Sequence, residues 1–283
     1  MNYWTARTAL TSALKLLIAF FGFSFVFSLL FSHLFKVPID HFRRLRTVIE
    51  FGKATDALTV ISLSNILAAI SLMILAKYFF DFQFRREPHR ITFARAIFFT
   101  FLPLIIILPS FVVMLVFDRQ VSFTLREGFV FNSPILFFLL VVAFTEEVVF
   151  RFVLFKVILN TTRNIYFTIL LTSVLFAFAH ILNGLSFVGF LSIFVCGALL
   201  CLILVKTRSL VYAIIFHFFW NFFQGPILGF RVSGLTFPSL FDINIENGNL
   251  LNGGSFGLEG SLIALVLLTL TVGLGFLKKT QRA

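Results

Sequence analysis

A short polar stretch interrupts an otherwise apolar segment and carries three ionisable residues. It reads FTEEVVFRF, from Phe144 to Phe152, and contains Glu146, Glu147 and Arg151. Residues four apart lie on one face of an α-helix, so Glu147 and Arg151 are predicted to form an ion pair. Glu146 is rotated from Glu147 by about 100° on the same helix and therefore points elsewhere. A carboxylate in such a setting could act as a general base.

Two further polar sets occur within later apolar segments. His180 lies near the end of LFAFAHILNG, and His217 and Asn221 lie four apart in AIIFHFFWNF. An imidazole and a carboxamide on one helix face can both donate hydrogen bonds, which the stabilisation of a tetrahedral oxyanion requires. A charged residue at mid-bilayer costs about 2.5–3.5 kcal/mol on insertion scales, so such residues usually mark a function. The alternative for each set alone is structural, a packing hydrogen bond or an ion pair that only orients a helix.

The elements that position these residues must be membrane helices, because the composition excludes a soluble domain. Of 283 residues, 59% are hydrophobic and 12% charged, with 44 Phe and a mean hydropathy of +1.03, far outside the soluble range. The net charge of +11 comes from Lys and Arg that lie mostly between the apolar segments. This pattern suits anionic lipid headgroups and argues against a nucleic-acid partner.

The hydropathy pattern predicts an all-α fold, a polytopic transmembrane helical bundle of about eight spans. A bilayer core of about 30 Å needs about 20 apolar residues per helix. Backbone groups in lipid must be satisfied internally, which favours a helical bundle, and strands are unlikely because the apolar segments are long and do not alternate. The segments are Leu16 to Phe35, Ala57 to Ala76, Ala96 to Phe117, Pro134 to Leu159, Ile165 to Leu182, Phe187 to Val205, Leu210 to Phe230 and Ser261 to Leu277.

The spans are expected to form one integrated membrane domain. Residues 1–95 would be an N-terminal transmembrane pair with basic loops, and residues 96–283 the helical core that carries the polar sets. The Gly- and Asn-rich connection 231–260 is predicted to be an ordered loop that leads into the last helix. Cys196 and Cys201 lack the spacing of metal ligands and are interpreted as packing residues.

The three polar sets, taken in order, resemble the motifs of a known family. E-E-x-x-x-R, F-x-x-x-H and H-x-x-x-N on three hydrophobic helices are typical of the CPBP family, the CAAX proteases and bacteriocin-processing enzymes, also called the Abi family. The resemblance runs from about Pro134 to Gly225 and includes Gly197, and Arg208 replaces a Gly found in many relatives. The motif residues here are Glu146, Glu147 and Arg151, then Phe176 and His180, then His217 and Asn221.

The resemblance implies an intramembrane endopeptidase similar to the CAAX prenyl endopeptidase, in which water is activated without a covalent acyl-enzyme. Glu146 would be the general base and His180 would help to hold the water. The oxyanion would be stabilised by His217 and Asn221, with Glu147 and Arg151 in support. No cofactor is implied. Zinc bound by Glu146, His180 and His217 is the alternative, although Asn221 beside His217 suits an oxyanion better.

The expected substrate is a peptide or a membrane-anchored protein within the lipid bilayer. The expected location is the cytoplasmic membrane of a bacterium, with multiple passes. Two other functions fit a polytopic chain with buried polar residues. A transporter or proton relay predicts paired broken helices and repeat symmetry, and the sequence shows neither. A non-catalytic bacteriocin-immunity scaffold would need no intact motifs, whereas all three are intact.

Overall fold

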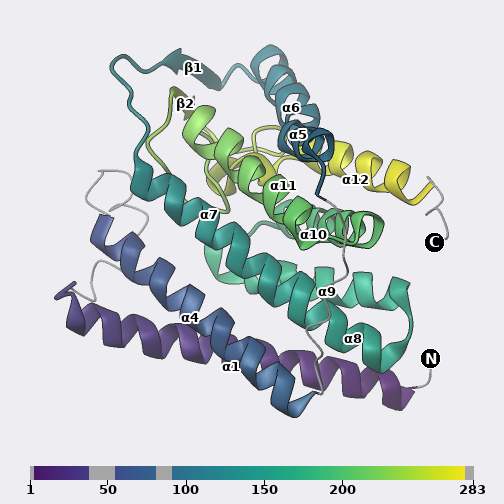
Figure 1. Cartoon of the computed structure of the whole chain (residues 1–283). Coiled ribbons are helices and arrows are strands. Elements are labelled where there is room, and N and C mark those ends of the chain that lie inside the picture. Colours follow the sequence, from purple (N-terminus) through teal and green to yellow (C-terminus); the bar gives the residue numbers. More distant parts are fainter. Residues whose placement is uncertain (1–2, 38–54, 81–90, 278–283) are drawn as a thin grey trace. The chain divides into compact units, whose positions relative to one another are not determined.

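The computed structural model describes residues 3–37, 55–80 and 91–277, and Figure 1 shows a predominantly helical chain. The elements are α1 (Tyr3–Leu34), α4 (Thr55–Phe79), α5 (Phe93–Phe101), α6 (Leu104–Phe117), β1 (Val121–Leu125), α7 (Ser133–Glu147), η1 (Val148–Leu154), α8 (Phe155–Thr162), α9 (Ile165–Ala179), η2 (Ile181–Asn183), α10 (Phe187–Thr207), α11 (Leu210–Phe222), η3 (Phe223–Ile227), β2 (Phe241–Ile245), η4 (Gly254–Phe256), η5 (Leu258–Gly260) and α12 (Leu262–Leu277). Each predicted apolar segment is helical over nearly all of its length. The all-α prediction is confirmed.

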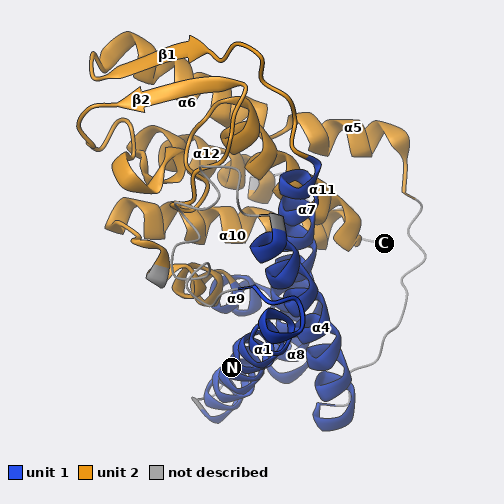
Figure 2. Ribbon diagram, turned by 90° about the vertical axis from the view of Figure 1, so that its left-hand side faces the viewer, with its two compact units in different colours: residues 1–88, 133–172 blue, residues 89–132, 173–283 orange. Residues whose placement is uncertain are grey.

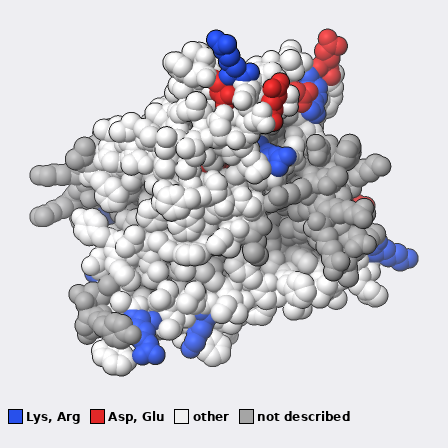
Figure 3. All heavy atoms as spheres, turned by 180° about the vertical axis from the view of Figure 1, so that it is seen from behind, with Lys and Arg blue, Asp and Glu red and all other residues white. Residues whose placement is uncertain are grey.

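The helices have the length and surface of membrane spans. Many large apolar side chains are exposed, among them Ile18, Phe25 and Leu274, and Figure 3 shows large areas without a charged residue. Surfaces of this kind require contact with acyl chains. The chain is thus a multi-pass membrane protein, and the count of eight spans stays a prediction. Among the described residues, five helical segments are long and apolar enough to cross a bilayer: Trp4–Leu34, Asp56–Phe79, Phe93–Phe117, Phe187–Thr207 and Leu210–Ile227.

The third predicted span is not one regular helix. It divides into α5 and α6 at Leu102 and Pro103. Proline has no backbone N–H to donate to the preceding turn, and its ring clashes with the carbonyl four residues earlier. Pro109 lies inside α6. The direction of this span therefore changes along its length.

Two short strands lie outside the predicted membrane segments, all of which are helical. β1 pairs with β2 in antiparallel register, from Val121 opposite Ile245 to Leu125 opposite Phe241. An exposed ion pair between Arg126 and Asp242 follows at the end of this ladder. Both strands lie in polar connections between the apolar segments. Water can satisfy open strand edges there, so the constraint that the bilayer imposes does not apply.

The chain forms two compact units. Unit 1 comprises residues 1–88 and 133–172, and unit 2 comprises residues 89–132 and 173–283 (Figure 2). In unit 1, α1 packs along α4, and the Ser24 hydroxyl donates to Asn65 Oδ1 over 2.6 Å. The basic connections predicted at 36–56 and 77–95 lie largely outside the described residues. The division at residue 95 stays a prediction.

Unit 2 is tied together at both ends of its helices. At one end, the Thr92 N–H donates to the Tyr212 hydroxyl over 2.8 Å, which joins the start of α5 to the start of α11. At the other end, the buried Asp118 carboxylate accepts from the side chains of Asn249 and Asn252 over 2.8 and 2.7 Å. Burial raises the pKa of Asp118, but hydrogen bonds from Asn249, the Gln120 N–H and Asn252 outweigh it, so this pKa lies below its usual value.

Candidate active site

The first motif lies in unit 1, where α7 passes into a π-helical stretch. α7 ends at Glu147, and Arg151 lies within η1. The Arg151 Nη1 and Glu147 Oε1 atoms are 3.0 Å apart, and both side chains have no exposed surface. The predicted ion pair is confirmed. Buried charges are stable only when paired, and π-helical turns inside α-helices frequently occur at functional sites.

Glu146 has a different environment from its neighbour. Its side chain is partly exposed, whereas that of Glu147 is fully buried. One residue along a helix is a rotation of about 100°, so the two carboxylates leave α7 in different directions. The prediction that Glu146 does not share the position of Glu147 beside Arg151 agrees with this difference in exposure.

The second motif ends α9 in unit 2 with a specific hydrogen bond. The backbone N–H of His180 donates to the Ala177 carbonyl over 3.1 Å. In a regular α-helix it would donate to the carbonyl of Phe176, one residue earlier. His180 Nδ1 lies 2.8 Å from that Phe176 carbonyl oxygen. A carbonyl only accepts, so Nδ1 carries the hydrogen and Nε2 of the neutral ring holds the lone pair. Such a nitrogen can accept a hydrogen bond from water.

The third motif lies on α11 and meets the second around one phenylalanine. His217 and Asn221 are both buried, one turn apart. The ring centroid of Phe176 lies 4.8 Å from that of His180 and 6.2 Å from that of His217, with interplanar angles of 64° and 86°. Phe176 therefore contacts both histidines edge to face. The sequence identified Phe176 as part of the second motif but did not indicate its contacts with the two histidines, which the structure shows.

Gly197 on α10 packs closely against α9, next to Phe176. A Cβ atom at Gly197 would lie 3.2 Å from Ser173 Cα and 3.3 Å from Phe176 Cδ1. These distances are tighter than ordinary van der Waals contact, so a side chain at this position would require α9 or the Phe176 ring to shift by a few tenths of an ångström. Small residues serve the same purpose in other membrane helix pairs.

A buried carboxylate that the site prediction did not include fixes the rotation of α11. Glu259 Oε1 accepts from Trp220 Nε1 over 3.0 Å, and Oε2 accepts from the Ser233 N–H and hydroxyl over 2.9 and 3.0 Å. Trp220 lies between His217 and Asn221 in sequence, so its anchor also sets the direction of their side chains. The sequence signal was the Gly-rich stretch GGSFGLEG, which belongs to the connection predicted to be an ordered loop before the last helix.

The Gly-rich stretch needs glycine to bring Glu259 inward. Gly257 has a φ of +94°, and a Cβ there would lie only 2.0 Å from the Arg231 carbonyl oxygen. The prediction of an ordered loop is confirmed, because η4 and η5 lie within it and Glu259 at its end is buried.

The site residues thus belong to both units. Unit 1 joins Glu147 to Arg151, and unit 2 joins His180 and His217 through Phe176. The approach of Glu146 to the two histidines stays a prediction. The same holds for zinc, whose proposed ligands come from both units. Within either unit, the described residues contain no group of three His, Cys, Asp or Glu side chains placed to bind one metal.

Comparison with known protein families agrees with the motifs. Residues 129–223 match the family described as type II CAAX prenyl endopeptidase Rce1-like. The matched segment is about a third of the chain, includes all three motifs and nearly coincides with the segment expected from the sequence. The predicted family is confirmed. No curated protein matches the chain.

Proposed function

We propose, since residues 129–223 belong to the Rce1-like family of type II CAAX prenyl endopeptidases, that this chain cleaves a peptide bond with water activated by Glu146 and His180. The family supports an intramembrane endopeptidase of the CAAX-protease kind. The roles of individual residues are our proposal. They define a hydrolase that forms no covalent bond to its substrate.

The proposed reaction uses the side chains as follows. A Glu146 carboxylate oxygen accepts a proton from water, and the water oxygen bonds to the scissile carbonyl carbon. His180 Nε2 accepts a hydrogen bond from the same water and orients it. Hydrogen bonds from His217 and the Asn221 amide stabilise the oxyanion. When the carbonyl re-forms, the C–N bond breaks and Glu146 returns its proton to the leaving amine.

One observation carries this proposal most directly, the position of Phe176 against both histidines. Its ring contacts His180 and His217, and its carbonyl accepts from His180 Nδ1. One residue therefore sets the tautomer of the proposed water-binding histidine and packs against the proposed oxyanion donor. A purely structural histidine requires neither the neighbour nor the tautomer.

Supporting roles follow for the buried charges. The Glu147–Arg151 pair would fix the direction in which Glu146 leaves α7. The hydrogen bond of Glu259 to Trp220 would do the same for His217 and Asn221 on α11. These four residues are positioning residues in this scheme, because none of them needs to touch the substrate.

The proposed substrate is a membrane-anchored protein or a peptide that enters from the lipid bilayer. The membrane is proposed to be the cytoplasmic membrane of a bacterium. A prenylated protein with a CAAX end is one candidate, and a secreted peptide precursor or a membrane anchor is another. No cofactor takes part in the proposed reaction.

Peptides from membranes of cells with and without the protein provide the test. We expect a defined set of cleavage products that disappears in Glu146→Gln and persists in Glu246→Gln, a matched change at an exposed glutamate. Cleavage of synthetic CAAX peptides, with and without the prenyl group, then identifies the substrate class. A folded Glu146→Gln protein that still cleaves would overturn the mechanism. Loss of cleavage by the unsubstituted protein on addition of a chelator would favour zinc.

A further inference from the structure

The two-stranded sheet of unit 2 has one closed edge and one open edge. β1 and β2 pair with each other (Figure 2), so each strand has one edge that faces away from its partner. Gly229 covers that edge of β2, since a Cβ atom there would lie 2.3 Å from the Phe241 carbonyl oxygen and 3.3 Å from the Ile243 nitrogen. A further strand can therefore pair only with β1.

The hydrogen bonds that flank the ladder show which groups of β1 point outward. The Arg126 N–H donates to the Leu240 carbonyl over 2.9 Å, and the Glu246 N–H donates to the Gln120 carbonyl over 3.0 Å. In an antiparallel ladder, hydrogen-bonded pairs alternate with non-hydrogen-bonded pairs, so the even-numbered residues of β1 bond to β2. The odd-numbered residues point their N–H and C=O groups away from β2.

Phe123 and Leu125 form this open edge of β1. Within the described parts of the chain, the N–H and C=O groups of these two residues have no hydrogen-bond partner. Leu125 is 62% exposed. Natural edge strands are usually protected by Lys, Pro or a bulge, whereas β1 reads VSFTL and pairs without a bulge. An unprotected edge of this kind can pair with another extended chain.

The open edge has an apolar side and a polar side. Phe123 and Leu125 share one face of β1, and the Phe123 ring stacks on that of Phe241 with centroids 4.4 Å apart. Ser122 and Thr124 are exposed on the other face. A chain paired with β1 places every second side chain beside Phe123 and Leu125, and apolar side chains fit that side.

The Leu125 end of the open edge lies toward the proposed oxyanion site. Leu240, which accepts from Arg126, donates its own N–H to the Pro226 carbonyl over 2.8 Å. Pro226 belongs to η3, which continues α11, and follows Asn221 by five residues, little more than one helical turn. A chain paired with β1 therefore runs toward the end of α11 near which Asn221 lies.

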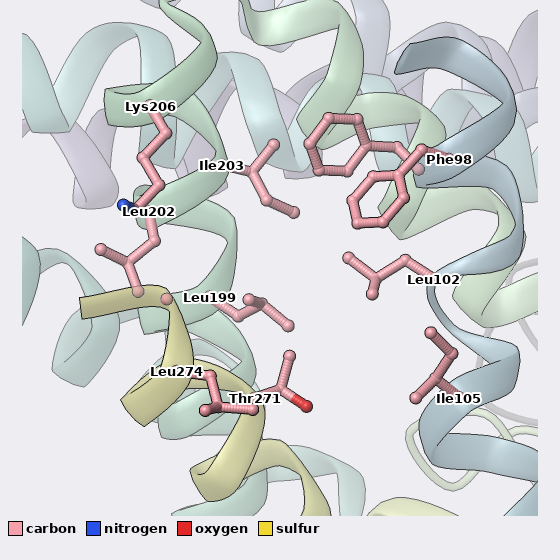
Figure 4. A pocket seen from close by; sticks show the side chains of 11 residues that line it. Phe98, Leu102, Ile105, Leu199, Leu202, Ile203, Lys206, Thr271 and Leu274 are labelled. Atoms are coloured by element: carbon pink, nitrogen blue, oxygen red, sulfur yellow. The ribbon is translucent and has the colours of Figure 1, made fainter. Parts of the chain in front are cut away.

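The apolar cavity of unit 2 is less suited to a peptide backbone. Its volume is about 480 Å³, and Figure 4 shows its side chains facing a common space. The lining side chains are apolar except those of Lys206 and Thr271, and the Thr271 hydroxyl donates to the Leu267 carbonyl over 2.8 Å. A buried peptide group without a hydrogen bond costs free energy, so an extended backbone is better satisfied at β1.

We propose, on the basis of the function proposed above, that the open edge of β1 binds an extended segment of the peptide substrate as a third strand. An antiparallel partner exchanges two hydrogen bonds with each of Phe123 and Leu125, and affinity comes from these main-chain bonds. A strand of five residues is about 17 Å long. This length suits a short peptide and is too small for a stable contact between two copies of the chain.

Binding of a fluorescein-labelled hexapeptide of alternating valine and threonine to the detergent-purified protein tests the edge. The valines lie on the apolar side, so their N–H groups face β1. We expect N-methylation of the valine nitrogens to weaken binding at least about fivefold, the net effect of one hydrogen bond. N-methylation of the threonine nitrogens should change binding little. Absence of binding, or equal binding of the two methylated peptides, would overturn the proposal.

A pair of variants tests the same edge from the side of the protein. Leu125→Pro removes one outward N–H and leaves the ladder intact, since proline is tolerated where the N–H of an edge strand faces solvent. Leu125→Ala shortens the same exposed side chain and keeps the N–H. We expect about fivefold weaker peptide binding for Leu125→Pro and nearly normal binding for Leu125→Ala. Normal binding by a folded Leu125→Pro protein would refute the role of the edge.

Competition identifies the occupant. The alternating peptide should slow the release of cleavage products from membranes, and the peptide with methylated valines should not. Binding without competition, or a dimer of the purified protein that Leu125→Pro dissociates, would assign the edge to another partner and contradict the proposal. Glu146→Gln should bind the peptide like the unsubstituted protein. Failure of the edge is thus measured separately from failure of the mechanism, which cleavage by Glu146→Gln would show.

Discussion

Replacement of Arg151 by Met removes the charge but largely keeps the side-chain volume, and it should destabilise the protein strongly. The guanidinium and the Glu147 carboxylate are 3.0 Å apart and neither side chain is exposed. Removal of one partner of a buried ion pair costs about 3–5 kcal/mol, because the other charge stays buried. At about 2–4 °C per kcal/mol for chains of this size, the midpoint of thermal unfolding should fall by roughly 6–20 °C.

The double variant separates a charge effect from a packing effect. Glu147→Gln alone should also destabilise the protein. The free energy of unfolding of the double variant, Glu147→Gln with Arg151→Met, should lie within about 1 kcal/mol of that of the unsubstituted protein, since apolar or neutral replacements of a buried pair are often tolerated. Tryptophan fluorescence of the detergent-purified protein during heating measures all three. Glu146→Gln is the control at the adjacent, partly exposed position and should change stability little. Additive losses in the double variant would refute the reasoning.

Three further changes have definite expected outcomes. Trp220→Phe removes a hydrogen bond to the buried Glu259 carboxylate and should cost about 1.5–3 kcal/mol in thermal unfolding, with slower cleavage. Gly197→Leu should destabilise by about 1–3 kcal/mol through overpacking and lower cleavage, whereas Gly273→Leu, where a Cβ meets nothing within 4 Å, should do neither. Because the folded-state pKa of Asp118 lies below its unfolded value, its carboxylate stabilises the fold above about pH 4 and this contribution is lost as pH falls through the folded-state value. The unfolding temperatures of the unsubstituted protein and of Asp118→Asn should therefore differ by a constant amount between pH 5 and 8. The difference should disappear in acid.

Features set by local geometry were predictable from the sequence. The helices follow from long apolar segments, since a bilayer leaves the backbone no other partner. The Glu147–Arg151 pair follows from helical spacing alone. His180 was placed correctly near the end of its helix, and the motif order was enough to predict the family that residues 129–223 match.

Features set by long-range contacts were not predictable. Trp220 and Glu259 are 39 residues apart, and no hydropathy pattern indicates that they meet. The pairing of Val121 with Ile245 joins two connections separated by several spans. The π-helical turns of η1 and η3 depend on packing against neighbouring elements. The tautomer of His180 depends on a carbonyl released by one tightened turn.

Chemical cross-linking between helices tests the central claim most directly, that Glu146 faces the histidine on α11. In a chain whose Cys196 and Cys201 are replaced by Ala, Glu146→Cys and His217→Cys are combined and treated in membranes with a short bifunctional thiol reagent. Phe144→Cys with His217→Cys is the control, because Phe144 is exposed on another face of α7. The account predicts rapid cross-linking for the Glu146 pair and little for the control. Equal cross-linking of both pairs, or of the control alone, would contradict it.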